Sequence, residues 1–259
     1  QALKRMAATG EINDLHVIPG FTDPVKLILP INSDKRFRQI RETRIPSSNA
    51  AIIFARDGSG SMDAEKCEII SDMAWWISVW IKRFYQRVER MWIWHDTSAK
   101  EVDEETFFRL RQGGGTTIST AFELIDAQFD NRFPPNKWNI YVFYFTDGEN
   151  WPEDNEKLIK RLQDKYPAGV VNFVGITQVM SYTYEGTVKE AIDKAVEDGT
   201  LDGNQIRTTS IGPMIENDSD APMMIYDLPT LAEDERDEAI MDAIKALLGK
   251  SAGRMVTDS

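Results

Sequence analysis

The sequence contains little cysteine and no long apolar run, and these absences limit the classes of protein to which it can belong. Cys67 is the single cysteine among 259 residues, so no disulfide can form within the chain, which fits a reducing compartment. No apolar stretch approaches the roughly 20 residues of a membrane-spanning helix, and the start has no signal-peptide pattern. We therefore expect a cytoplasmic protein without a membrane span. Because the chain begins with Gln1 rather than Met, we expect it to be part of a longer protein.

Basic residues are also scarce. The sequence has 30 Lys and Arg against 42 Asp and Glu, which gives a formal net charge of −12. Such a field repels phosphates and argues against non-specific binding to nucleic acid or an anionic membrane, but it attracts cations. The segment 34–44 (DKRFRQIRETR) is a basic exception, which we interpret as solvated surface.

The length and composition predict one large domain with extensions. The hydrophobic fraction of 42% is enough for a substantial core. Residues 1–48 are interpreted as an N-terminal extension, because Gly20, Pro24 and Pro30 interrupt any regular pattern there. We expect residues 49–250 to form the domain and residues 251–259 to form a tail.

Within this domain, apolar runs alternate with segments of helical periodicity. The pattern predicts strands over 50–55, 91–94, 138–145, 169–177 and 205–211, and helices over 61–88, 117–128, 153–165, 187–196 and 234–248. Alternating strands and helices are typical of βαβ units. We therefore predict an α/β fold, doubly wound, with a mostly parallel sheet of five or six strands and helices on both faces.

Three polar clusters lie where ligands bind in such a fold, beyond the carboxyl ends of the strands. They are 57–61 (DGSGS), 113–117 (GGGTT) and 146–149 (TDGE). Together they provide two carboxylates and three hydroxyls, and no His or Cys, from Asp57, Ser59, Ser61, Thr116 and Asp147. Hard oxygen ligands of this kind select Mg²⁺, Mn²⁺ or Ca²⁺. With only two carboxylates, the ion keeps positive charge and can accept an acidic group from a partner.

The D-x-S-x-S run, the later Thr after glycines and the T-D-G after a strand resemble the metal-ion-dependent adhesion site of von Willebrand factor A-type domains. The resemblance spans about residues 49–176. It implies a divalent-metal-dependent protein–protein interaction module, with Ser59, Ser61 and Thr116 as direct ligands. Asp57 and Asp147 would bind directly or through water. Arg56 and Gly58 depart from the family, which usually has apolar residues there.

Several segments are similar to the bacterial YeaH/YhbH family: His95–Thr97 with Ala99–Val102, Glu105–Phe108, Phe133–Pro135 with Trp138–Tyr141, and Asp147–Trp151. This similarity implies a regulatory role in a stress or sporulation system, with a PrkA-like serine kinase or a SpoVR-like protein as partner. Trp151 follows the T-D-G loop, where an aromatic residue would suit an interface. We expect Glu149, Asn150 and Trp151 to contact the partner.

The same residues allow other interpretations. Asp57 and Ser59 could merely cap the following helix. A helix–loop–helix calcium loop is rejected because Met62 stands where glycine is required. A metal-dependent phosphohydrolase with Asp57 as nucleophile, or an enzyme subunit, is an alternative function, although Ser59 stands where hydrolases of the haloacid dehalogenase type have a second carboxylate. We expect no catalytic residue. A purely structural metal is a further alternative. His95 is interpreted as a structural histidine.

Overall fold

The computed structural model describes residues 47–110, 114–180, 186–212 and 233–249. These residues all lie in the compact unit that spans Arg44–Ser259. The predicted extension at 1–48, its basic segment 34–44 and the predicted tail at 251–259 fall outside the described residues, apart from 47 and 48.

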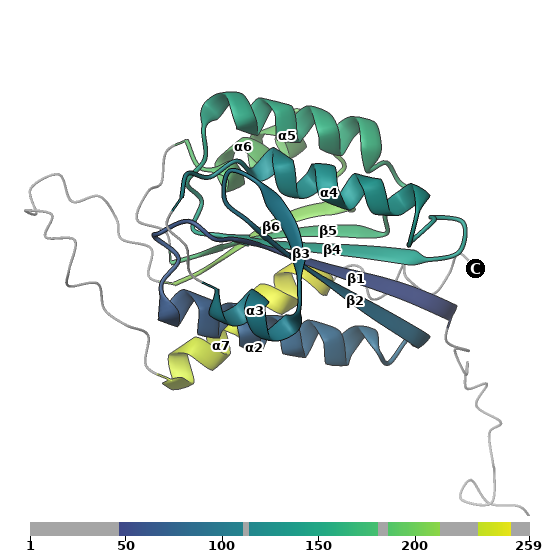
Figure 1. Cartoon of the computed structure of the whole chain (residues 1–259), viewed down its shortest axis with the longest axis horizontal. Coiled ribbons are helices and arrows are strands. Elements are labelled where there is room, and N and C mark those ends of the chain that lie inside the picture. Colours follow the sequence, from purple (N-terminus) through teal and green to yellow (C-terminus); the bar gives the residue numbers. More distant parts are fainter. Residues whose placement is uncertain (1–46, 111–113, 181–185, 213–232, 250–259) are drawn as a thin grey trace, which may run out of the picture. The chain divides into compact units, whose positions relative to one another are not determined.

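The fold is built on a six-stranded sheet with the spatial order β3-β2-β1-β4-β5-β6 (Figure 1). Only β3 runs antiparallel to its neighbour; the other pairs are parallel. The strands are β1 (Ser47–Asp57), β2 (Tyr85–His95), β3 (Ala99–Val102), β4 (Asn139–Thr146), β5 (Phe173–Val179) and β6 (Ile206–Ile211). The central strands β1, β4 and β5 are almost entirely buried, as expected for strands covered on both faces.

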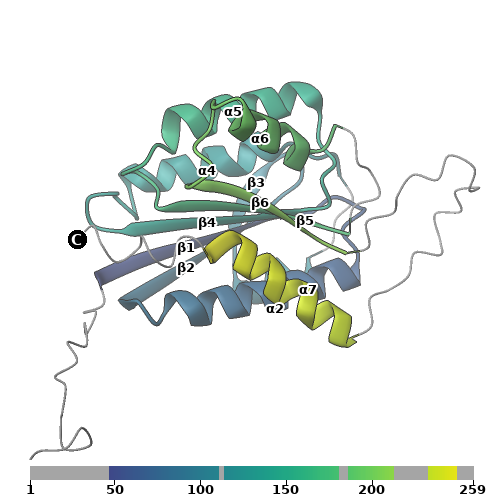
Figure 2. The same ribbon diagram turned by 180° about the vertical axis from the view of Figure 1, so that it is seen from behind.

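Helices cover both faces of the sheet (Figures 1 and 2). One face carries α2 (Ala64–Ile81), α3 (Glu104–Arg109) and α7 (Glu233–Leu248). The other carries α4 (Ile118–Asp130), α5 (Pro152–Lys165) and α6 (Val188–Glu197). Each layer has its own apolar core, because alternate side chains of every strand point to opposite faces. The predicted doubly wound α/β fold is confirmed.

The winding places a topological switch point between β1 and β4. After β1 the chain crosses through α2 to β2 on one side, and later enters β4 on the other side of β1. Ligands in open α/β sheets bind at such a point, beyond the carboxyl ends of the strands. Asp57 ends β1 and Asp147 directly follows β4, so the two predicted carboxylates flank this point.

Several predicted boundaries were wrong. The helix predicted over 61–88 ends at Ile81, and β2 begins at Tyr85, four residues later. Tyr85 is a buried strand residue because it pairs with Ser47 and hydrogen-bonds the hydroxyl of Tyr141 on β4. The strand predicted over 169–177 begins only at Phe173. Among the described residues, none of the helices combines the length and apolar character needed to cross a membrane.

Candidate metal-binding site

The loop after β1 gathers its polar side chains around the Asp57 carboxylate. The Ser59 amide donates a hydrogen bond to Asp57 Oδ1 at 2.8 Å, and the Ser59 and Ser61 hydroxyl oxygens are 3.0 Å apart. Asp63 is the residue that caps α2, since its Oδ1 accepts from the Lys66 amide at 2.9 Å. Asp57 and Ser59 are therefore not helix caps, and that alternative is wrong.

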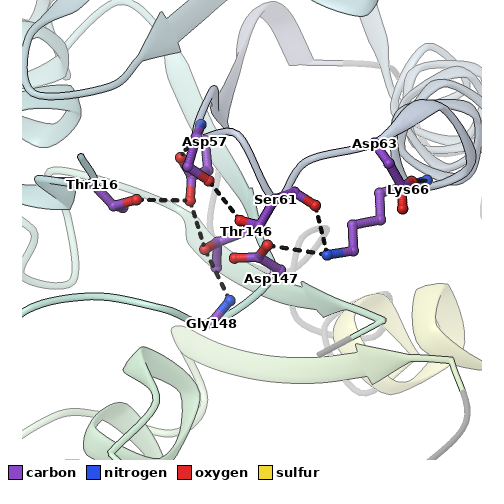
Figure 3. Close-up of polar contacts among 9 residues, drawn as sticks. Asp57, Ser61, Asp63, Lys66, Thr116, Thr146, Asp147 and Gly148 are labelled. Carbon is purple, nitrogen blue, oxygen red and sulfur yellow. Dashed lines mark hydrogen bonds and ion pairs between the residues drawn. The ribbon is translucent and has the colours of Figure 1, made fainter. Parts of the chain in front are cut away.

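Two other loops reach the same carboxylate (Figure 3). Thr116, just before α4, directs its hydroxyl to Asp57 Oδ2 at 3.5 Å. Thr146, at the end of β4, donates to the same oxygen at 3.3 Å and accepts from the Gly148 amide at 3.0 Å. The three sequence clusters thus meet, as predicted, although the contact of Thr146 with Asp57 was not foreseen.

The two departures from the family pattern have structural reasons. Gly58 packs against the indole of Trp94, where an added Cβ would lie 2.1 Å from a ring carbon, so no larger residue fits. Arg56 is fully buried on the face of α2 and α3, and donates to Cys67 Sγ and to the Leu110 carbonyl, both at 2.7 Å. Its guanidinium also lies 5.6 Å from the centre of the Phe107 ring. Arg56 therefore connects β1 to α2 and to the end of α3, and Gly58 lets the loop pack closely against β2.

Asp147 is held by Lys66, a residue that was not predicted from the sequence to belong to the site. The ammonium of Lys66 on α2 lies 3.0 Å from Asp147 Oδ2 and donates to the Ser61 carbonyl at 2.9 Å (Figure 3). The other oxygen, Asp147 Oδ1, is buried and has no hydrogen-bond partner among the described residues. The sequence did carry a signal, because Lys66 occupies an inward-facing position of the helix between Met62 and Ile70.

Burial shifts the pKa of two groups near the site. It is the main cause that raises the pKa of Asp57 to about 6; the neighbouring Asp147 contributes to the rise, while hydrogen bonds from Ser59 and Thr146 oppose it. Burial lowers the pKa of His95 to about 4. The neutral His95 ring contacts the Tyr144 hydroxyl at 2.9 Å and the Asp96 carbonyl at 3.2 Å, which agrees with a structural role.

The donor set fits a hard divalent cation. In the described ranges, no group of three or more His, Cys, Asp or Glu side chains could hold a metal, so hydroxyls would have to complete a site here. Asp147 Oδ1 is buried and has no hydrogen-bond partner among the described residues, so it is available as a ligand. The 3.0 Å between the Ser59 and Ser61 hydroxyls matches the separation of about 3.0 Å between neighbouring ligands of an octahedral Mg²⁺.

A surface cavity of about 450 Å³ opens directly beside these hydroxyls. It is lined by Ser59, Gly60, Ser61, Gly114, Gly115, Thr116, Glu149, Asn150 and Trp151. The three residues predicted to contact a partner therefore share a cavity with the three predicted hydroxyl ligands. Trp151 is 65% exposed, which is unusual for an indole.

A second buried carboxylate, Asp154 in the first turn of α5, connects α4 to the loop after β4. It accepts hydrogen bonds from the amide and hydroxyl of Ser119 on α4 and from the side-chain amide of Asn150. Asp154 was not identified from the sequence, where it reads as an ordinary acidic residue at a helix start. It fixes the cavity wall that contains Asn150.

The sheet order and the two helix layers define a doubly wound α/β domain whose candidate site lies at the switch point between β1 and β4. The chain belongs to the family described as "Protein of unknown function (DUF444)", which matches residues 21–216. The predicted relationship to the YeaH/YhbH family of such domains is confirmed.

Curated relatives carry the name UPF0229 protein. One from Clostridium botulinum (strain Eklund 17B) is 33% identical over 165 residues, which cover 64% of this chain and 42% of that protein. Another from Legionella pneumophila (strain Paris) is 35% identical over 169 residues, which cover 64% of this chain and 40% of that protein. The chain thus spans about two fifths of the length of these relatives.

Solved structures with a similar arrangement of elements are distant in sequence. The ArnB paralog VWA2 from Sulfolobus acidocaldarius is 15% identical with a TM-score of 0.42, over 64% of this chain and 42% of that chain. An aerotolerance-related membrane protein from Bacteroides fragilis, with multiple mutations to serines, is 14% identical with a TM-score of 0.46, over 78% of this chain and 100% of that chain.

Proposed function

We propose that this domain is a divalent-metal-dependent protein-interaction module. The ion would be held by Ser59, Ser61 and Thr116 with Asp57 and Asp147, and it would bind an acidic side chain of a partner protein. The observation that carries the proposal is the cavity beside the hydroxyls, whose wall also contains Glu149 and Trp151. A purely structural ion would not need this opening.

The surroundings of the site favour binding over catalysis. His95 is fully buried, and both of its ring nitrogens contact neighbouring oxygens, so it is not placed to exchange protons with a substrate. Ser59, where a phosphohydrolase of the type considered above needs its second carboxylate, contributes only a hydroxyl. We therefore propose that the domain is not an enzyme.

The partner that fits this site is a protein with an exposed Asp or Glu. The net charge of −12 disfavours acidic surfaces elsewhere on the domain, so the ion would give selectivity for one side chain. The YeaH/YhbH resemblance makes a PrkA-like serine kinase and a SpoVR-like protein the candidates to test, in a stress or sporulation system in the cytoplasm. Mg²⁺ is the proposed ion, with Mn²⁺ or Ca²⁺ as substitutes.

The test combines metal titration with partner capture. We expect the full chain to bind Mn²⁺, and Asp57→Ala or Asp147→Ala to abolish that binding while the circular dichroism spectrum stays that of a folded α/β protein. Asp164→Ala on the exposed side of α5 is the matched control and should bind Mn²⁺ normally. Capture of either candidate partner should disappear in EDTA and return with excess Mg²⁺.

Two results would contradict the proposal. Partner capture that persists in EDTA would show that the ion does not form the contact. Mg²⁺-dependent turnover of a generic phosphoester, lost in Asp57→Asn, would favour the phosphohydrolase instead.

A further inference from the structure

Lys66 is placed where a lysine is unfavourable unless it has a specific task. Its side chain is fully buried, although transferring an ammonium from water into a protein interior costs several kcal/mol. It also lies in the first turn of α2, where the positive end of the helix dipole disfavours a cation. The contacts of its ammonium with Asp147 and Ser61 contribute to offsetting these costs.

Because of Lys66, the two oxygens of the Asp147 carboxylate have different surroundings. Oδ2 receives the ammonium at 3.0 Å, whereas Oδ1 is buried without a hydrogen-bond partner among the described residues. A carboxylate held at one oxygen cannot rotate freely, so Oδ1 has a fixed orientation. Outer partners commonly orient metal ligands in this way. The bond to the Ser61 carbonyl fixes the neighbouring ligand loop through the same ammonium.

We propose that Lys66 is a positioning residue that also sets the charge of the metal-loaded site, and so determines that the site takes a carboxylate. This inference rests on the proposed metal-dependent function. Asp57 and Asp147 contribute −1 each, Lys66 contributes +1 and a divalent ion contributes +2, so the loaded site has a net charge of about +1. Without Lys66 the loaded site would have no formal net charge, and the ion would attract an anion more weakly.

The experiment separates metal binding from anion binding in the full chain. Mn²⁺ binding is followed by electron paramagnetic resonance at pH 8, where Asp57 is ionised. Acetate is then titrated into the Mn²⁺-loaded protein, and its binding is read from the loss of exchangeable water on the ion. The variants are Lys66→Met, which removes the charge, and Lys82→Met, a control at the exposed C-terminal end of the same helix.

We expect Lys66→Met to bind acetate on the order of tenfold more weakly than the original chain, because one nearby positive charge is lost. Its Mn²⁺ affinity should not fall, because loss of the like charge beside the ion offsets the freer Asp147 carboxylate. Lys82→Met should change neither affinity. Because Lys66→Met leaves a buried carboxylate uncompensated, folding is checked by circular dichroism in Mn²⁺.

Lys66→Gln, which is neutral but can still donate a hydrogen bond to Asp147, keeps the test valid if Lys66→Met does not fold. It removes no proposed ligand, so Mn²⁺ binding should be kept, and its acetate affinity should fall by a similar factor because the positive charge is lost. Unchanged acetate affinity in Lys66→Met or, where that variant does not fold, in Lys66→Gln overturns this inference alone. If the original chain binds no Mn²⁺, the proposed function fails and this inference fails with it.

Discussion

Asp57 is the proposed ligand whose charge depends most on its surroundings. Its carboxylate ends β1 in a fully buried position, and burial raises its pKa to about 6. The unfolded chain has an Asp pKa of about 3.9. Between these two values the folded protein binds more protons than the unfolded chain. The contribution of Asp57 to folding stability is therefore greatest below about pH 4 and declines as the pH rises to about 6.

Replacing Asp57 with Asn should remove this decline in metal-free protein. In EDTA, Asp57→Asn should match the original chain in stability near pH 4 and exceed it above pH 7 by about 3 kcal/mol, the free energy of a shift of about two pKa units. Urea unfolding at a series of pH values measures the difference. A constant difference between pH 4 and pH 8 would show that the Asp57 carboxylate is not destabilised by burial.

Local sequence points to the proposed ligand residues because each cluster carries its own pattern of glycines and oxygen side chains after an apolar run. It did not identify Lys66 or Asp154. An aspartate at a helix start is an ordinary surface residue when judged from local sequence, and the inward-facing spacing of Lys66 indicates burial without indicating its partner. Their roles arise from partners 81 and 35 residues away in the chain, which only the tertiary fold brings into contact.

At the scale of elements, Asp154 connects α5 to α4 and to the loop after β4. Its carboxylate accepts from Ser119 on α4 and from Asn150 in the loop that forms the cavity wall. Asn150 in turn donates to Asn155 at 2.8 Å. One side chain thus keeps two segments of the candidate site at a fixed separation.

Asp154→Asn should loosen this connection. An amide cannot accept all three hydrogen bonds, so we expect a loss of about 2 kcal/mol in unfolding free energy. We also expect a weaker Mn²⁺ affinity, because Asp154 holds α4 and the proposed ligand Thr116 directly precedes that helix. Chemical denaturation and Mn²⁺ titration measure the two effects. Asp164→Asn, on the exposed face of α5, is the control and should change neither. Normal Mn²⁺ affinity in Asp154→Asn would show that Asp154 supports the fold alone.

Helices and strands were predictable where the hydrophobic periodicity was strong. They were less predictable where pairing with a neighbouring strand determines the structure. Apolar runs located β1, β4 and most of β5. Tyr85–Val88 continues the helical spacing of α2, yet pairing with β1 draws it into a strand. The short strand β3 and helix α3 were not predicted. β3 (AKEV) is polar and forms an edge strand only because β2 offers it hydrogen-bond partners.

At the scale of the whole molecule, the acidic composition and the candidate site both favour the binding of cations. A net charge of −12 raises the local concentration of cations around the domain. A ligand that binds only the folded state stabilises it by mass action. Metal binding should therefore be visible as a gain in global stability.

Addition of Mg²⁺ at a hundred times its dissociation constant should raise the unfolding free energy by about 2.7 kcal/mol. Thermal or urea unfolding with and without Mg²⁺ measures the gain, with NaCl at matched ionic strength as the control for screening. Asp147→Ala should show no gain. An equal gain in NaCl alone would mean that screening of the acidic surface, rather than site binding, stabilises the fold.

Because Cys67 is buried, a second cysteine placed at the rim of the cavity could be labelled selectively. The single thiol is 4% exposed beneath the loop and accepts a hydrogen bond from Arg56. A Trp151→Cys variant would therefore present one reactive sulfur to a maleimide dye, at the rim of the cavity, without removal of the natural cysteine. A fluorophore attached there would report directly on whatever enters the space beside the hydroxyls.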